Sequence, residues 1–350
     1  MDISRPGMVV ALVAHPPRFG ATVRSYDATE ALQVAGVSEI VEIARGVAVV
    51  ADSFWSAKKG RDALSIDWDF SSAENRSSDE IFAHYEALAN GDGLVARELG
   101  DAAASLGSAQ STVRREFRFP FLALAAMEPM DCVVEVGEGR CEFWTGSQFQ
   151  TNDQYVAAAI LGLQPEQVEI HTHFAGGSFG RRAVPDSDYV AEAVMIAKAI
   201  GGRAPVKLIW TREDDMRAGR YRPMSHHILE GGVDENGEVA AWRHKVTMQS
   251  FLAGTAFEAM IQEGIDGTSV EGARNLPYAI QNMRVELQPA DNGVPTLWWR
   301  SVGHSHNAFA TEAFFDEMAH LAGKDPYRYR RDLLAEHPRY LAVLDLVAEK

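Results

Sequence analysis

A glycine-rich stretch at residues 171–182, His-Thr-His-Phe-Ala-Gly-Gly-Ser-Phe-Gly-Arg-Arg, has the residue types of an anion-binding loop. Alternating apolar and polar residues before it predict a strand over 168–173. Helical spacing after it predicts a helix over about 189–200, capped by Asp186 or Ser187. Glycines let backbone N–H groups approach a ligand, a helix N-terminus favours negative charge, and arginines add forked donors. The pattern therefore predicts either an anion cradle or, equally well, a tight structural turn.

Several other kinds of site are excluded by spacing. Gly176-Gly177-x-x-Gly180 is not G-x-G-x-x-G, and no Lys-Ser/Thr follows, so neither a dinucleotide fold nor a P-loop is predicted. Ser178 has no obvious base and no G-x-S-x-G elbow, which argues against a serine hydrolase. No HExxH motif occurs, so we expect no direct protein ligand to a metal among the paired histidines, which are His171 and His173, His226 and His227, and His304 and His306.

Three polar residues stand at positions that suit a ligand. Gln148 follows a predicted strand, so it points into a crevice at strand ends or simply caps the next helix. Arg222 precedes Pro223, which holds it extended and able to present its guanidinium to an anion. Arg300 lies among aromatic residues just before a predicted helix.

Composition narrows the class of protein. The chain has 350 residues, enough for two domains, and its net charge of −16 argues against a nucleic-acid or anionic-membrane partner. Cys132 and Cys141 are too few for an iron–sulfur cluster or a structural zinc; they form either one disulfide or two core thiols. No apolar run approaches the length of a transmembrane segment.

The pattern of elements predicts an α+β protein. Residues 1–75 read as a compact α+β domain, 76–110 as a linker with short helices, and 111–350 as a second domain. Hairpins are expected around Gly137-Glu-Gly139 and at Asp234-Glu-Asn-Gly237, and a helix is expected to begin at Pro326.

Seven short motifs follow one another in a fixed order. They are Met127-Glu-Pro129, Gly146-Ser-Gln148, Gly176 to Arg182, Asp186 to Tyr189 with Glu192, Trp210 to Met216, Tyr221-Arg-Pro223 and Trp299 to Gly303. In this order they resemble a known family, the molybdopterin-binding large subunit of molybdenum hydroxylases (the xanthine dehydrogenase family). The branch that the chain resembles is that of isoquinoline 1-oxidoreductase beta subunits and related aldehyde dehydrogenases. Residues 1–70 are similar to the family's α/β hammerhead domain, so the resemblance implies this domain followed by the first molybdopterin-binding domain, with mixed sheets and flanking helices.

The resemblance implies a role for individual residues. Gln148 and Arg222 match catalytic positions, the first beside a molybdenum oxygen ligand and the second beside the substrate. Val302 stands in the substrate pocket where xanthine-oxidising relatives have an aromatic residue, which puts a purine substrate in doubt. The cofactor-binding positions are Gly177, Ser178, Phe179, Gly180, Arg181 and Arg300.

The function implied is hydroxylation of an N-heterocycle or oxidation of an aldehyde, with water as the oxygen source. The cofactor is a molybdenum–molybdopterin, in its dinucleotide form, and the electrons pass to a [2Fe–2S] small subunit. The family's catalytic glutamate, in a Gly-Glu-Pro-like motif, is absent from this sequence. We therefore expect a fragment of a larger subunit, inactive alone and completed by the remaining parts of that subunit. A truncated, non-catalytic paralogue acting as a binding protein is the alternative. The resemblance places it in the bacterial periplasm or cytoplasm, with the periplasm favoured.

Overall fold

The computed structural model describes residues 2–350, which form two compact units. Unit 1 contains the described residues up to Asn75, together with Ala123–Arg222 and Gly293–Trp299. Unit 2 contains Arg76–Leu122, Pro223–Asn292 and Arg300–Lys350. The chain thus passes between the units several times, whereas the predicted domains, 1–75, 76–110 and 111–350, were consecutive. Residues 123–222 pack with the first 75 residues instead of with the rest of the predicted second domain.

Unit 1 is built on a mixed seven-stranded sheet. The central strands are nearly continuous runs of Val, Ala and Leu because helices or loops cover both of their faces. Two-stranded ribbons accompany the sheet: β2 (Thr22–Asp27) with β5 (Ser65–Asp69), and β13 (Tyr221–Arg222) with β8 (Leu122–Ala123). Across the sheet the order is β11 (Val168–Thr172), β10 (Arg140–Thr145), β9 (Asp131–Gly137), β12 (Val206–Ile209), β1 (Val9–Ala14), β4 (Gly46–Ala51) and β3 (Val37–Ile43).

Helices cover the two faces of this sheet. One face packs on α5 (Gln150–Leu161) and α6 (Asp188–Ala199), which bury the main core of the unit. The other face, over β1 and β4, packs on α2 (Phe54–Asp62), next to the short α1 (Thr29–Leu32). The turn α7 (Arg212–Arg217) follows β12, and its capping box is formed by Thr211 and Asp214.

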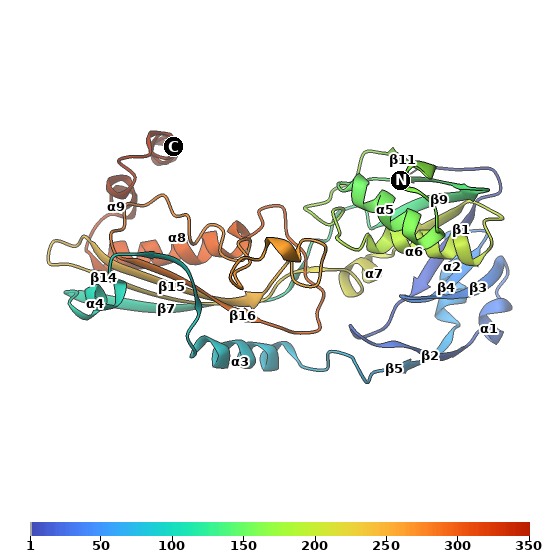
Figure 1. The fold of residues 1–350 in the computed structure, drawn as a ribbon, viewed down its shortest axis with the longest axis horizontal. Coiled ribbons are helices and arrows are strands. Elements are labelled where there is room, and N and C mark those ends of the chain that lie inside the picture. The colour runs from blue at the N-terminus through green and yellow to red at the C-terminus, as the bar shows by residue number, and fades with distance from the viewer. Residues whose placement is uncertain (1) are drawn as a thin grey trace. The chain divides into compact units, whose positions relative to one another are not determined.

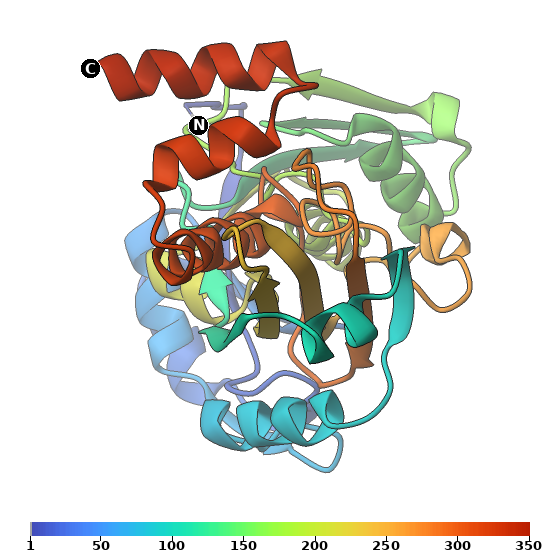
Figure 2. The same cartoon turned by 90° about the vertical axis from the view of Figure 1, so that its left-hand side faces the viewer.

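Unit 2 is a five-stranded sheet with helices on both faces (Figures 1 and 2). The long helix α8 (His304–Leu321) covers one face, where Trp242 meets Phe314 and Phe315. Helix α3 (Ser78–Ala89) lies against the other face, and Lys245 of the sheet donates to its last turn. The strands are, in order, β6 (Leu94–Leu99), β16 (Met283–Ala290), β15 (Val239–Gln249), β14 (Ser225–Val233) and β7 (Ser111–Phe119); the other helices are α4 (Ala102–Gly107), α9 (Pro326–Leu333) and α10 (Pro338–Glu349).

Most predicted elements are present, and the differences are informative. Both hairpins, β9–β10 and β14–β15, form at the predicted turns. The segment 76–110 contains α3 and α4 but also β6, which pairs with β16, so it belongs to the sheet of unit 2 and does not merely connect two domains.

Three further predictions concern single residues and helices. Ser187 holds the N-cap position of α6, yet its side chain makes no cap bond to the helix. Cys132 and Cys141 are free, buried thiols. Among the described helices none has both the length and the apolar character that a transmembrane span requires.

A charged network around His15 holds β1, α2, α6 and α7 together. His15 Nε2 lies 3.0 Å from Glu192 Oε1, and its Nδ1 lies 3.9 Å from Asp214 Oδ1. Arg61 contacts the same Asp214 at 2.7 Å. Burial disfavours the imidazolium, but the carboxylates of Glu192 and Asp214 outweigh burial and raise the pKa of His15 to about 9.

We predict that the stability of unit 1 falls as the pH rises from 6.5 to 9. A folded-state pKa above the unfolded value stabilises the folded state below the unfolded pKa, and this stabilisation is lost as the histidine deprotonates. Over this range the loss should be about 3 kcal/mol, and His15→Asn should remove the dependence. Urea unfolding at pH 6, 7.5 and 9 measures it, with exposed His173→Asn as control; an unchanged slope in His15→Asn contradicts the assignment.

Three buried histidines lie between the sheet and α8 of unit 2. His227 Nδ1 is 2.9 Å from His244 Nε2, its Nε2 is 3.0 Å from Ser225 Oγ, and the His306 ring lies 5.5 Å from that of His227. Burial, together with the nearby His306, lowers the pKa of His244 to about 3.

We predict that unit 2 loses stability on acidification below pH 6.5, because the unfolded chain binds a proton that the folded His244 refuses until about pH 3. Between pH 6.5 and 5 the loss should be about 2 kcal/mol. His244→Gln, which cannot titrate, should flatten this part of the stability profile, while exposed His320→Gln should leave it as in the wild type. Circular dichroism during acid titration in mild urea gives the measurement.

Candidate functional site

The predicted strand, glycine loop and helix are present in unit 1 as β11, residues 173–187 and α6. Gly176 is required for close approach, because a Cβ there would lie 2.5 Å from the Cβ of Glu128. Gly177 has φ +100°, a backbone conformation that L side chains rarely adopt. The loop therefore passes tightly over the segment around Glu128, and these two glycines allow it to do so.

The two arginines of the loop turn inward. Arg181 is 1% exposed and forms a bidentate pair with Asp188, at 3.0 and 2.8 Å, with its guanidinium 5.2 Å from the ring of Trp210. Arg182 donates to Gly177 O at 3.1 Å and to Glu128 Oε2 at 2.8 Å. Burial disfavours ionisation of Asp188, but Arg181 outweighs it and holds the pKa of that carboxyl below its usual value. Both guanidinium groups thus bind carboxylates of this chain. The sequence pattern had suggested that they would bind an external anion.

Gln148 is brought to the loop. It follows β10, is exposed, and its Oε1 accepts a hydrogen bond from the hydroxyl of Ser178. Its backbone N–H donates to Arg182 O at 3.0 Å. Next to it, Ser147 donates to the buried Asp153 at 2.5 Å, and burial raises the pKa of Asp153 to about 6. Gln148 and the loop therefore form one surface, which joins two of the motifs found in the sequence.

The loop also offers unused backbone donors. Within residues 2–350, the N–H groups of the four consecutive residues from Gly177 to Gly180 have no hydrogen-bond acceptor, whereas those of Gly176, Arg181 and Arg182 do. Most of this loop is open to solvent, where such donors bond to water, and a run of consecutive backbone N–H groups is an arrangement that binds anions in proteins. This set of donors fits a group that is rich in oxygen or sulfur acceptors, as a molybdenum–pterin cofactor is.

Arg222 lies in the same unit, on the short strand β13. It is 8% exposed, and burial lowers the pKa of its guanidinium from the ordinary value. Next to it, Tyr221 is held by backbone bonds to Pro295 and Leu297. Arg222 is therefore a desolvated cation on a fixed backbone.

Arg300 and Val302 belong to unit 2, in the turn that precedes α8. Arg300 is exposed, and Val302 has φ +49°, which is strained for a β-branched residue. Phe179 in the glycine loop is strained in the same way, with φ +58°. Backbone strain of this kind is concentrated at functional sites, and these two residues are among five non-glycine residues with positive φ in the described part of the chain.

Glu128 is a residue that the sequence reasoning left out of the site. Its carboxylate accepts from Gly176 N and from Arg182 Nη2, each at 2.8 Å, and so connects the two ends of the glycine stretch. The Met127-Glu-Pro129 motif was visible in the sequence, but no spacing rule relates residue 128 to residues 176–182.

Comparisons with known proteins identify the family of the chain. A family model described as the molybdopterin cofactor-binding domain matches residues 88–334. The isoquinoline 1-oxidoreductase subunit beta of Brevundimonas diminuta is 29% identical over the whole chain, which covers 46% of that relative. A membrane-bound aldehyde dehydrogenase [pyrroloquinoline-quinone] of Gluconacetobacter polyoxogenes is 28% identical over 97% of this chain and 46% of its own.

The fold is also shared with a solved structure. Quinoline 2-oxidoreductase from Pseudomonas putida 86 superposes on 99% of this chain and 51% of its own, with a TM-score of 0.77 and 16% identity. The predicted arrangement of mixed sheets with flanking helices is confirmed by this likeness. The chain spans about half the length of the relatives it matches. Since the family model matches well over half of the residues, the chain belongs to the molybdopterin cofactor-binding domain family.

Proposed function

We propose that this chain is the molybdenum-cofactor-binding part of an oxidoreductase that hydroxylates an N-heterocycle or oxidises an aldehyde, with water as the oxygen source. The observation that carries the proposal is the run of four unpartnered backbone N–H groups, Gly177 to Gly180, beside the exposed amide of Gln148. Membership of the family and the names of the relatives support the class of reaction.

In this proposal the loop backbone binds the cofactor, and Arg181 and Arg182 hold the loop in position. We assign the acceptor atoms of the cofactor to the backbone donors of Gly177, Ser178, Phe179 and Gly180. Arg181 holds the loop in place through Asp188 and does not itself reach the ligand, because its guanidinium is buried. Arg300, which belongs to unit 2 and is exposed, is proposed as a cofactor-binding residue on the family resemblance alone.

Gln148 and Arg222 act on polar and charged atoms. Rotation of the Ser178 hydroxyl frees the Gln148 amide to donate from its Nε2 or to accept at its Oε1. Arg222 keeps its charge in a desolvated place, where a cation stabilises negative charge that develops on a substrate more strongly than it would in water. The bound cofactor would supply the two-electron oxidation itself, which no side chain can perform.

The substrate is an electron-poor N-heterocycle or an aldehyde. Val302 supplies no aromatic surface on which a purine could stack, so we do not expect a purine.

We propose that the electrons leave through a [2Fe–2S] small subunit, because the only cysteines of this chain are two buried thiols whose pKa values burial raises. The remaining part of the large subunit is proposed to complete the site.

The first prediction from this proposal concerns metal content. The complex recovered from its source through this chain should contain about one molybdenum per chain, together with iron, as measured by elemental mass spectrometry. An intact, folded complex without molybdenum contradicts the proposal and supports the alternative of a non-catalytic paralogue.

Gly177→Ala should lower the molybdenum content of the complex. The added Cβ strains a backbone at φ +100° by about 1 kcal/mol and displaces the N–H groups that follow. The matched control is Gly162→Ala at the end of α5. Gly162 has φ +73° and free space around it, so this substitution introduces backbone strain without disturbing the glycine loop. Equal molybdenum loss in the two variants would mean that the loop has no special role.

Gln148→Leu should retain molybdenum but lower kcat by about 10- to 1,000-fold, because it removes a polar contact to the reacting atoms. Gln150→Leu is the matched control: its amide donates to Ser147 O in the same turn and does not face the loop. Steady-state kinetics with an aldehyde or a heterocycle and a dye acceptor measure the effect. Equal activity of Gln148→Leu and Gln150→Leu would remove Gln148 from the reaction.

A further inference from the structure

Three glutamates stand in one row across the edge of the seven-stranded sheet of unit 1. Glu142 on β10 is directly opposite Glu135 on β9 and directly opposite Glu169 on β11. Like charges in directly opposed positions destabilise a sheet, so such a row requires cations beside it. Arg5 supplies one of them, with its Nε and Nη2 3.0 and 2.9 Å from Glu135 Oε2. Arg140 supplies a second, with its Nη1 3.2 Å from Glu142 Oε1, and one oxygen each of Glu142 and Glu169 lies close to His171.

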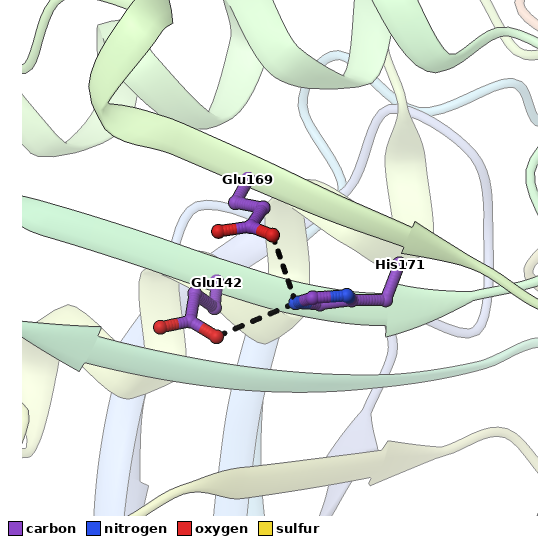
Figure 3. Close-up of side chains that lie close together, drawn as sticks. All are labelled: Glu142, Glu169 and His171. Carbon is purple, nitrogen blue, oxygen red and sulfur yellow. Dashed lines mark hydrogen bonds and ion pairs between the residues drawn. The ribbon is translucent and has the colours of Figure 1, made fainter.

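His171 faces those two carboxylates (Figure 3). It lies two residues beyond Glu169 on β11, so both side chains are on the same face of the sheet. Its Nε2 is 3.3 Å from Glu142 Oε2 and 3.7 Å from Glu169 Oε1. One donor atom from each of the three residues lies within 4.8 Å of the others.

The imidazole ring is fixed in this direction. It stacks on Trp144, its partner across the β10–β11 pair, with ring centroids 4.7 Å apart and planes at 9°. Trp144 is itself 8% exposed and lies under the guanidinium of Arg5, 4.6 Å away. The imidazole nitrogen is therefore held in place before any ligand arrives.

The distances are compatible with a shared metal ion as well as with a hydrogen bond between His171 Nε2 and Glu142 Oε2. A charge-assisted N–H···O hydrogen bond would bring the atoms to about 2.7–2.9 Å. Two ligands bound tetrahedrally to zinc at about 2.0–2.1 Å are about 3.3 Å apart. The contact to Glu142 has this length, and the contact to Glu169 exceeds it by a few tenths of an ångström. Imidazole nitrogens and carboxylate oxygens are both zinc ligands in proteins.

We propose that Glu142, Glu169 and His171 bind one divalent transition-metal ion, Zn²⁺, with water completing its coordination. The ion would add positive charge between the two opposed glutamates, of which Glu142 already has Arg140 beside its other oxygen, and would fasten the edge strand β11 to β10. Because β11 leads directly into the glycine loop, bound zinc would stabilise the strand that precedes that loop. The site lies within unit 1 and is independent of the proposed oxidoreductase function.

Isothermal titration calorimetry with Zn²⁺ tests this on the full chain, as isolated and after treatment with a chelator. We expect about one zinc per chain with a Kd in the micromolar range, and an increase in Tm at saturating zinc. Zinc binding is measured without turnover, so failure of this site leaves the molybdenum measurement unaffected. Absence of binding at about 100 μM zinc would overturn the proposal.

Matched variants locate the ion. His171→Asn and Glu142→Gln should each weaken zinc binding by at least about tenfold. His173→Asn, an exposed histidine two residues further along, should bind zinc as the wild type does. Circular dichroism confirms that each variant is folded. If His171→Asn binds zinc normally, or if His173→Asn loses it equally, the assignment of the ligands is wrong.

Discussion

The shape of the glycine loop depends on two arginines that point away from it. Arg181 is fully buried against Asp188 at the start of α6, and Arg182 reaches back to Glu128 and to the carbonyl of Gly177. Removing one partner of a buried ion pair leaves an uncompensated charge, at a cost of about 3–5 kcal/mol. The ion pairs of Arg181 and Arg182 therefore fix the loop. The N–H groups of Gly177 to Gly180 take no part in these internal contacts.

This arrangement explains why glycine and strain occur together here. Arg182 can reach Glu128 only if residue 176 has no side chain, since a Cβ there would collide with Glu128. The turn that follows forces Phe179 into a left-handed conformation, which costs about 1–2 kcal/mol and persists because the ion pairs on either side over-determine it. A site that must present several N–H groups without moving is made rigid in this way before its ligand binds.

Local sequence patterns predicted much of the secondary structure, but they could not predict which distant strands pair. The hairpin turn at Asp234–Gly237 and the strand–loop–helix around the glycines follow from residue type and spacing. Strand β16 alternates in the sequence but was not recognised, and β6 was read as part of a linker, because each acquires its partners from distant segments. The resemblance assigned Gln148 and Ser178 separately to the cofactor, and neither their hydrogen bond nor the inward turn of Arg181 could be predicted, since a sequence does not reveal which side chains meet.

The same limit applies to His171. In the sequence it forms only an H-x-H pair with His173, which has no metal-binding spacing, whereas its neighbours in the fold include Glu142 from the adjacent strand. Register creates this cluster: a shift of β11 by one residue would turn Glu169 and His171 to the opposite face and place them in the apolar core under α5. The register that keeps Glu169 and His171 out of the apolar core therefore also places Glu135, Glu142 and Glu169 opposite one another, and their repulsion destabilises this edge of the sheet. A cation at this edge would reduce that repulsion at the strand on which the loop depends.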